Sequence, residues 1–161
     1  MDGIVGIYGP NDDQLVSKTF LATGACQHRG KASTGLAVGN GKGIYIYKGL
    51  GRIAEVIDQD LVRTFQHLEP VAAIGNIGYT KRKIAEKINV EPIEIFPRKD
   101  SKYKVVLTMD GYLLEDKDLK ADLDAHYSLQ TDNKTEIVGA LLHRYVEQEG
   151  IGFTAGERLI H

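Results

Sequence analysis

The feature that most constrains the fold is a short Gly-rich turn between two strand-like segments. Residues 34–38 and 43–47 are mainly apolar, β-branched or aromatic, and Gly39-Asn40-Gly41-Lys42 lies between them. Asn-Gly readily adopts the positive-φ backbone of a tight hairpin turn, so this pattern predicts an antiparallel β-hairpin.

Further strands and helices are predicted on both sides of the hairpin from apolar runs and helical spacing. Pro92 and Pro97 restrict residues 81–104 to loop with one brief strand. The expected elements are strands at 3–9, 71–79 and 103–109 and helices at 13–28, 58–68, 116–126 and 135–148. Because these strands and helices do not alternate strictly, the sequence predicts an α+β fold rather than a doubly wound parallel sheet.

Length and composition predict a single globular domain over residues 1–161. The net charge of −2 provides no overall positive field, so no nucleic-acid partner is expected. The longest uncharged stretch, residues 70–80, is about half the length of a bilayer-spanning helix, so no membrane segment is expected. The first residues do not resemble a secretory signal, which favours a cytoplasmic location.

Few residues stand out as metal or redox sites. The single cysteine, Cys26, excludes an intramolecular disulfide and is expected to be a small core residue. Cys26 and His28 lie two apart on an expected helix and cannot share a proton. The five histidines share no short spacing, so no metal and no cofactor are expected. The basic cluster Lys81, Arg82 and Lys83 either holds an anionic ligand or forms a solvated loop.

Three ordered blocks carry a family resemblance. Met1-Asp2-Gly3-Ile4-Val5-Gly6, Gln27-His28-Arg29-Gly30 and Tyr47-Lys48-Gly49-Leu50-Gly51 resemble segments of the class II glutamine amidotransferase domains. These domains are N-terminal-nucleophile hydrolases that begin Met-Cys-Gly-Ile-Val-Gly, and the glutaminase domain of amidophosphoribosyltransferases is the closest match. The resemblance runs from residue 1 to about residue 147.

The resemblance implies an Ntn-hydrolase-like αββα sandwich. Such domains continue beyond the helix at 135–148 with strands that complete the second sheet, and residues 150–161 leave little length for them. We therefore expect a protein partner or a second copy of the chain to cover an incomplete second sheet.

The catalytic positions implied by the resemblance carry different residues here. Asp2 stands at the place of the nucleophilic cysteine, and a carboxylate is a poor substitute for a thiolate. Asp110 stands at the place of the asparagine that donates to the oxyanion, although Gly111 beside it matches the family. An ionised Asp110 would repel the negative charge that develops during amide hydrolysis.

The substrate-binding positions differ as well. Gly78 stands where the family has the arginine that pairs with the substrate carboxylate, whereas Tyr79 and Thr80 match. Lys134 stands where the family has the aspartate that holds the substrate ammonium, and Asp132 is near enough to take that role.

These observations support three hypotheses. The first is a catalytically inactive amidotransferase-like domain that serves as a structural or regulatory subunit of an amidotransferase or synthase complex. The second is an active glutaminase or amidotransferase, or another amide hydrolase, with altered machinery around Asp2, Asp110 and Lys134. The third is a sensor that binds glutamine, another small amino acid or an anion.

Overall fold

The computed structural model describes residues 2–79, 87–111, 113, 117–131 and 133–150. The chain divides into two compact units. The first contains Met1–Pro92 and Thr108–Gly111, and the second contains Ile93–Leu107 and Tyr112–His161. The single domain expected over residues 1–161 stays a prediction.

The first unit is built on a four-stranded antiparallel sheet. Its strands are β1 (Gly3–Tyr8), β2 (Ser33–Gly39), β3 (Ile44–Leu50) and β4 (Ala72–Gly78), in the order β1-β4-β2-β3. Because β2 and β4 have a hydrogen-bonded neighbour on each side, they are almost entirely buried.

The predicted hairpin is confirmed. Strands β2 and β3 pair in antiparallel register, with Gly39 opposite Ile44. The Asn40 side-chain oxygen accepts hydrogen bonds from the backbone N–H groups of Lys42 and Gly43, both at 3.0 Å, and Gly41 has a φ of +78°. The Asn-Gly pair therefore supplies both the side-chain acceptor and the left-handed backbone that the turn needs.

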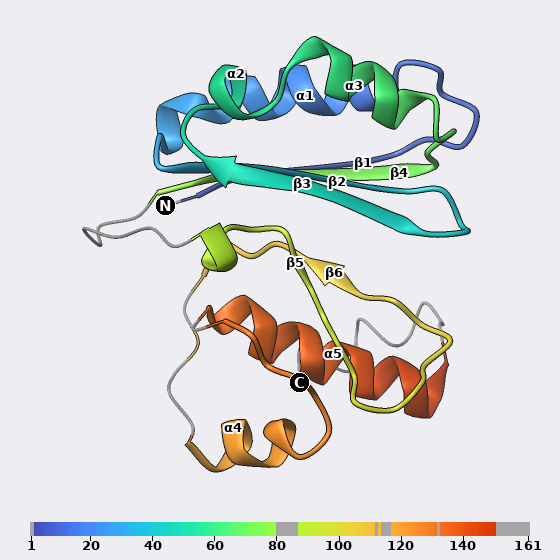
Figure 1. Cartoon of the computed structure of the whole chain (residues 1–161), viewed down its shortest axis with the longest axis vertical. Helices are drawn as coiled ribbons and strands as arrows, with labels where there is room; N and C mark the ends of the chain where they lie inside the picture. Colours follow the sequence, from blue (N-terminus) through green and yellow to red (C-terminus); the bar gives the residue numbers. More distant parts are fainter. Residues whose placement is uncertain (1, 80–86, 112, 114–116, 132, 151–161) are drawn as a thin grey trace. The chain divides into compact units, whose positions relative to one another are not determined.

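Helices cover one face of this sheet (Figure 1). They are α1 (Leu15–Ala25), the 3-10 helix η1 (Cys26–Arg29), α2 (Ile53–Val56) and α3 (Gln59–Gln66). The helix predicted over 13–28 is correct in place, but its last residues form the 3-10 helix η1. Helix α2 was not predicted. The core between the helices and the sheet includes the fully buried side chains of Leu15, Val16, Leu36, Val38, Ile57 and Ile77.

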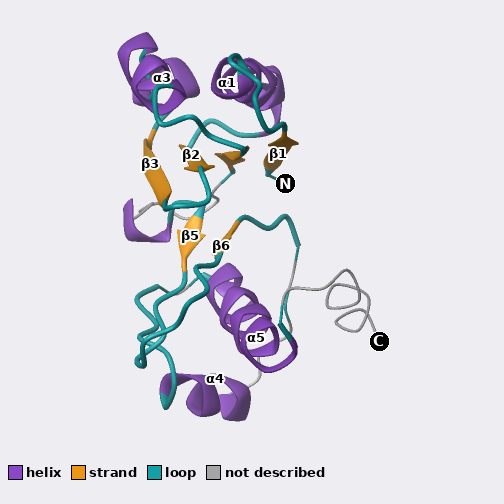
Figure 2. Cartoon of the chain, turned by 90° about the vertical axis from the view of Figure 1, so that its right-hand side faces the viewer, coloured by secondary structure: helices purple, strands orange, loops and turns teal. Residues whose placement is uncertain are grey.

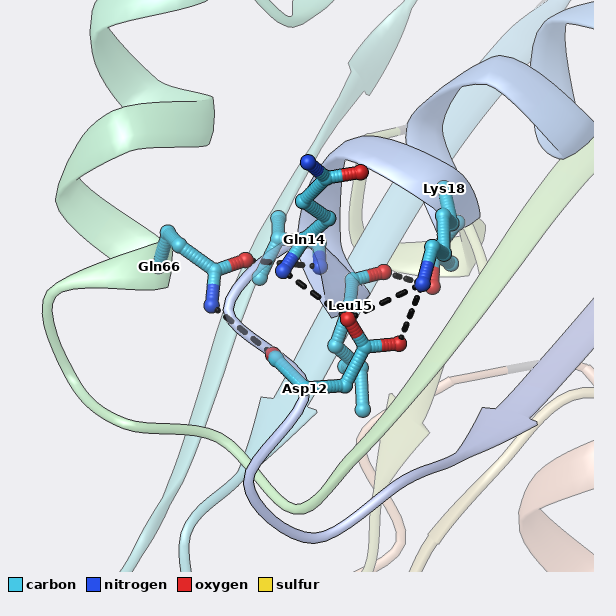
Figure 3. A network of polar contacts seen from close by, with 7 residues as sticks. Asp12, Gln14, Leu15, Lys18 and Gln66 are labelled. Atoms are coloured by element: carbon cyan, nitrogen blue, oxygen red, sulfur yellow. Dashed lines mark hydrogen bonds and ion pairs between the residues drawn. The ribbon is translucent and has the colours of Figure 1, made fainter.

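A polar network holds the start of α1 against α3 (Figure 3). The Asp12 carboxylate accepts from the backbone N–H of Gln14 at 3.0 Å and from the Lys18 ammonium at 2.8 Å. The Gln66 side chain bridges from α3, accepting from the backbone N–H of Val16 at 2.9 Å and donating to the Asp12 carbonyl at 3.3 Å. These contacts satisfy donors that a helix start leaves without intrahelical partners.

The second unit packs one long helix against a small sheet. Helix α5 (Lys134–Glu149) lies between α4 (Lys117–Asp124) and the two-stranded sheet of β5 (Ile93–Glu94) and β6 (Val106–Leu107) (Figure 2). The strand predicted at 103–109 is correct in place, but pairing is limited to two residues. The buried side chains of this core are Ile93, Ile95, Leu123, Tyr127, Ile137 and Ala140.

Two polar side chains, Asn133 and Glu136, stabilise the start of α5. The side chain of Asn133 caps the helix by accepting from the backbone N–H of Thr135 at 3.0 Å. Glu136 is 2% exposed and accepts from the backbone N–H groups of Gln130 at 2.8 Å and Thr131 at 2.7 Å. Through these hydrogen bonds, Glu136 holds the loop that precedes α5 against the first turn of the helix.

The short 3-10 helix η2 (Lys87–Asn89) completes the elements among the described residues. None of the helices in the described part of the chain is long and apolar enough to cross a membrane.

Candidate functional site

Asp2 and Asp110, which lie 108 residues apart in sequence, meet at the start of β1. The backbone N–H of Asp2 donates to Oδ1 of Asp110 at 3.2 Å. Asp2 is placed by the first residues of β1, and Asp110 by the segment Thr108–Gly111 that belongs to the first unit. Two positions singled out from the sequence therefore belong to one site.

Arg29 connects both residues. Its Nε donates to the Asp2 carbonyl at 2.7 Å, and its Nη2 donates to Oδ2 of Asp110 at 3.1 Å. The Arg29 and Asp110 side chains are 36% and 34% exposed, so solvent partly screens this ion pair. Arg29 reaches the site because η1 turns the chain at the end of α1 and runs beside β1.

The side chain of Asp2 has a hydrogen-bond partner different from those of its backbone. Its Oδ1 accepts from the backbone N–H of Tyr79, just past the end of β4, at 2.8 Å. Burial raises the pKa of Asp2 above its ordinary value of 3.8, the Tyr79 N–H opposes that rise, and the negative charges of Glu91 and Asp110 add to it. The site therefore holds the Asp2 proton more tightly than water would.

A second carboxylate, Glu91, organises the segment that carries Asp110. Glu91 is 6% exposed, and its Oε2 accepts from the Thr108 hydroxyl at 2.6 Å and from the backbone N–H of Met109 at 2.8 Å. The side chain of Asn76, on β4, donates to the Thr108 hydroxyl at 2.9 Å. Glu91 is thus a positioning residue for the 108–111 segment.

Close backbone approach explains several glycines around the site. A Cβ on Gly3 would lie 2.7 Å from the Cβ of Cys26, and a Cβ on Gly30 would lie 2.5 Å from the Gly78 carbonyl oxygen. A Cβ on Gly78 would collide with the Ser33 hydroxyl. A side chain larger than hydrogen at position 78, including the arginine of the family pattern, requires Ser33 to move.

The other residues singled out from the sequence lie outside the described residues, in the second unit, or beside Asp110. Thr80, Lys81, Arg82, Lys83 and Asp132 lie outside the described residues. Lys134 begins α5 in the second unit. Gly111 follows Asp110 in the first unit and is exposed.

Cys26 and His28 are accounted for by local structure. Cys26 is partly buried and packs against the first-unit core. The His28 ring nitrogen Nδ1 is 3.0 Å from the Ala25 carbonyl oxygen. Within the described ranges no group of three or more His, Cys, Asp or Glu side chains could hold a metal ion.

Sequence reasoning did not foresee the roles of Arg29 and Glu91. Arg29 belongs to Gln27-His28-Arg29-Gly30, a segment that resembles the family, and Glu91 stands where the family has glutamine. The resemblance was the only signal in the sequence, because local spacing does not bring either residue near Asp2 or Asp110.

The chemistry available to this site is proton binding by the Asp2 carboxyl group and ion pairing between Arg29 and Asp110. A carboxylate at position 110 accepts hydrogen bonds and has none to donate when ionised. The backbone N–H of Asp2 is directed at Asp110, and the Asp2 carboxylate is occupied by the Tyr79 N–H. Among these described contacts, the donors at the centre of the site already serve Asp2 and Asp110.

Comparison with known proteins supports the resemblance to class II glutamine amidotransferases that the sequence motifs predicted. Among particular relatives, the amidophosphoribosyltransferase of Methanocaldococcus jannaschii is 28% identical over 145 residues, which cover 89% of this chain and 30% of that protein. The amidophosphoribosyltransferase of Archaeoglobus fulgidus is 27% identical over 160 residues, 99% of this chain and 34% of that protein. An isomerizing glutamine–fructose-6-phosphate aminotransferase of Halalkalibacterium halodurans is 31% identical over 92% of this chain and 23% of that protein.

Solved structures agree on the fold. The allosteric regulatory enzyme of purine biosynthesis matches 99% of this chain and 32% of its own length, with a TM-score of 0.75 and 24% identity. The glutamine phosphoribosylpyrophosphate amidotransferase of B. subtilis, solved with ADP and GMP, matches with a TM-score of 0.69 and 24% identity. The resemblance and the Ntn-hydrolase-like α+β fold class are therefore confirmed. No family model matches the chain, and the chain spans about a third or less of the length of these relatives.

Proposed function

We propose that this chain is a class II glutamine amidotransferase-like domain that does not hydrolyse glutamine and serves as a structural or regulatory subunit of an amidotransferase or synthase complex. One observation carries the proposal. Where the resemblance implies a nucleophile and an oxyanion donor, Asp2 and Asp110 are joined to each other and to Arg29.

Each part of this network works against amide hydrolysis. Attack by the Asp2 carboxylate on glutamine would form a mixed anhydride with little driving force, whereas a thiolate forms a thioester. Asp110 presents a carboxylate where developing negative charge needs a donor, and loss of one such donor costs about a hundredfold or more in rate. Arg29, which contacts both residues, is already paired with Asp110 at 3.1 Å.

The test is calorimetric titration of L-glutamine into the full chain, combined with a direct assay of glutamate formation. We expect no sustained heat and no glutamate above the buffer rate. Glutamate that forms in proportion to protein concentration would overturn the proposal. Saturable heat without glutamate would support a sensor of glutamine in place of a structural subunit.

The subunit role is tested by purification of the chain from its native source under mild conditions. We expect a defined partner that carries a synthase or amidotransferase activity to elute with it in constant ratio. A chain that elutes alone at every concentration would contradict this role.

A second candidate is an enzyme with altered machinery, favoured by the raised pKa of Asp2. A partly buried carboxyl group close to the charges of Asp110 and Glu91 has the surroundings of a general acid or base. If glutamate formation is detected, Asp2→Asn should abolish it. Asp13→Asn is the matched control because Asp13 is an exposed aspartate outside the network. Equal activity in the two variants would exclude a catalytic Asp2.

A further inference from the structure

A pocket of about 390 Å³ is built only from residues of the second unit. Three segments line it: the loop at 97–101, the segment at 125–127 after α4, and the last turns of α5. Pockets that hold small molecules begin at about this size, near 300 Å³.

A buried hydrogen-bond network joins the three lining segments. His143 on α5 is 2% exposed, and its Nδ1 lies 3.1 Å from the Tyr127 hydroxyl while its Nε2 lies 3.0 Å from the Ser101 hydroxyl. The Tyr127 and His143 rings also meet edge to face, with centroids 5.5 Å apart. Because each wall contributes one member of this network, the walls are held in place before any ligand binds.

The pocket lining contains several cations. Arg98 and Lys99 are exposed on the 97–101 loop, and neither forms an ion pair with a described residue. The Nε of Arg98 donates to the Asp124 carbonyl oxygen at 3.0 Å, which orients the guanidinium without cancelling its charge. A third cation of the lining, Arg144, is already paired with Asp122 at 2.5 Å.

The carboxylates of the lining do not balance this charge. Glu147 accepts a hydrogen bond from Ser101 and lies 4.0 Å from Nε2 of His143, so it is engaged in the buried network. Asp100 is the other carboxylate of the lining. Among the described residues, two cations without an ion pair, Arg98 and Lys99, therefore outnumber the one remaining acid, and the pocket favours an anion.

We propose that this pocket binds a small phosphate monoester. A guanidinium offers two parallel N–H donors to a phosphate group, and an adjacent ammonium adds a compact second charge. A phosphate monoester carries close to two negative charges at neutral pH, which matches two consecutive cations better than a single carboxylate does. The exposed ring of His126 lines the same pocket and supplies a further donor.

The test is an NMR titration of the full chain, labelled with nitrogen-15, with inorganic phosphate and with glycerol 3-phosphate at constant ionic strength. Both probes should produce saturable shifts of the amide signals of residues 98–101 and of the C-terminal half of α5. Acetate and chloride at equal ionic strength should produce no saturable shifts of these amide signals. The absence of saturable shifts with both phosphate probes, or equal shifts with acetate, would overturn the proposal.

Variants separate the pocket from general surface charge. Lys99→Ala should weaken the binding of glycerol 3-phosphate. The double variant Arg98→Ala/Lys99→Ala should weaken it by about tenfold or more. Lys102→Ala is the matched control because Lys102 is exposed, contacts the Tyr103 ring at 4.6 Å and does not line the pocket. Lys99→Ala removes no hydrogen bond or ion pair between described residues, so it tests the proposal even if the Arg98 variant is unstable. Equal weakening by Lys102→Ala and Lys99→Ala would contradict a specific site.

Discussion

At the scale of single residues, two aspartates of the first unit respond to their surroundings in opposite ways. Burial raises the pKa of Asp2, whereas the hydrogen bond from Lys18 and the Gln14 N–H lower the pKa of Asp12. Both start from an ordinary value of 3.8. The same residue type thus makes opposite contributions to the pH dependence of stability.

Asp2→Asn should leave the free energy of unfolding at pH 7 unchanged or raise it. Because the folded pKa of Asp2 lies above 3.8, its contribution to stability is fully present below 3.8 and is lost as pH rises through the folded pKa. An asparagine oxygen still accepts from the Tyr79 N–H without a charge. Urea unfolding of both proteins at pH 7 and near pH 3.5 checks this, and the advantage of the variant should shrink at the lower pH. A marked loss of stability at pH 7 would show that the charged form is favoured.

Asp12→Asn should have the opposite pH dependence. Because the folded pKa of Asp12 lies below 3.8, its stabilising contribution is present above that value and is lost as pH falls through the folded pKa. The variant should therefore be less stable than the natural chain at pH 7 and closer to it at pH 3. Asp13→Asn, an exposed neighbour, serves as the control in the same unfolding experiment. A loss that is equal at both pH values would contradict the role of the Asp12 charge.

At the scale of elements, close approach of neighbouring backbone restricts which side chains strand β2 can carry. Strand β2 lies between β3 and β4, and a Cβ on its Gly35 would collide with the backbone carbonyl oxygen of Glu91. Gly39, at the end of the same strand, has no neighbour nearer than 3.9 Å to a Cβ. One strand therefore contains one glycine that tolerates a methyl group and one that does not.

Gly35→Ala should destabilise the fold by at least about 2 kcal/mol, since the obstructing atom belongs to the backbone and cannot rotate away. Gly39→Ala should change the free energy of unfolding by less than about 1 kcal/mol. Chemical denaturation of both variants measures the difference. Similar values for the two substitutions would show that β2 adjusts to the added methyl group.

Glu136→Ala should cost about 3 kcal/mol, because it leaves the backbone donors of Gln130 and Thr131 without their acceptor. The control is Glu149→Ala at the exposed end of the same helix, which should lie within about 0.5 kcal/mol of the natural chain. Thermal and urea unfolding provide both numbers. If Glu136→Ala is as mild as the control, water replaces the carboxylate at this site.

At the scale of the whole molecule, each unit has its own hydrophobic core, and the two sheets differ greatly in extent. The first unit places two central strands of seven residues within four strands, whereas the sheet of the second unit has two residues in each strand. Local resistance to opening increases with buried area and with hydrogen bonds shielded from water.

Amide hydrogen exchange should therefore be slowest in β2 and β4 and faster in β5 and β6. Leu36 and Ile77 are 1% and 0% exposed and should be among the most protected positions. Mass spectrometry or NMR of exchange under native conditions provides the measurement. Protection in β5 and β6 equal to that in β2 would indicate that the chain opens only as one cooperative unit.

Much of the fold could be predicted from local pattern. Asn40-Gly41 identified the hairpin, and apolar spacing located α1, α3, α4 and α5 within a few residues of their observed ends. The four-residue helix α2 was missed because it is too short for a helical period to be recognised. The strand at 103–109 was overestimated because a strand needs a partner, and pairing depends on residues distant in sequence.

The sequence by itself determined the turns, the main helices and strands, and the residue types at positions 2 and 110, because these depend on local backbone preference and on the order of the chain. Only the tertiary structure decided that Arg29 contacts both Asp2 and Asp110, that Glu91 holds the 108–111 segment, and that His143 joins the walls of a charged pocket. Each of these is a contact between side chains and distant segments. Such contacts exist only after the core has packed, because packing brings together groups that lie tens of residues apart in sequence.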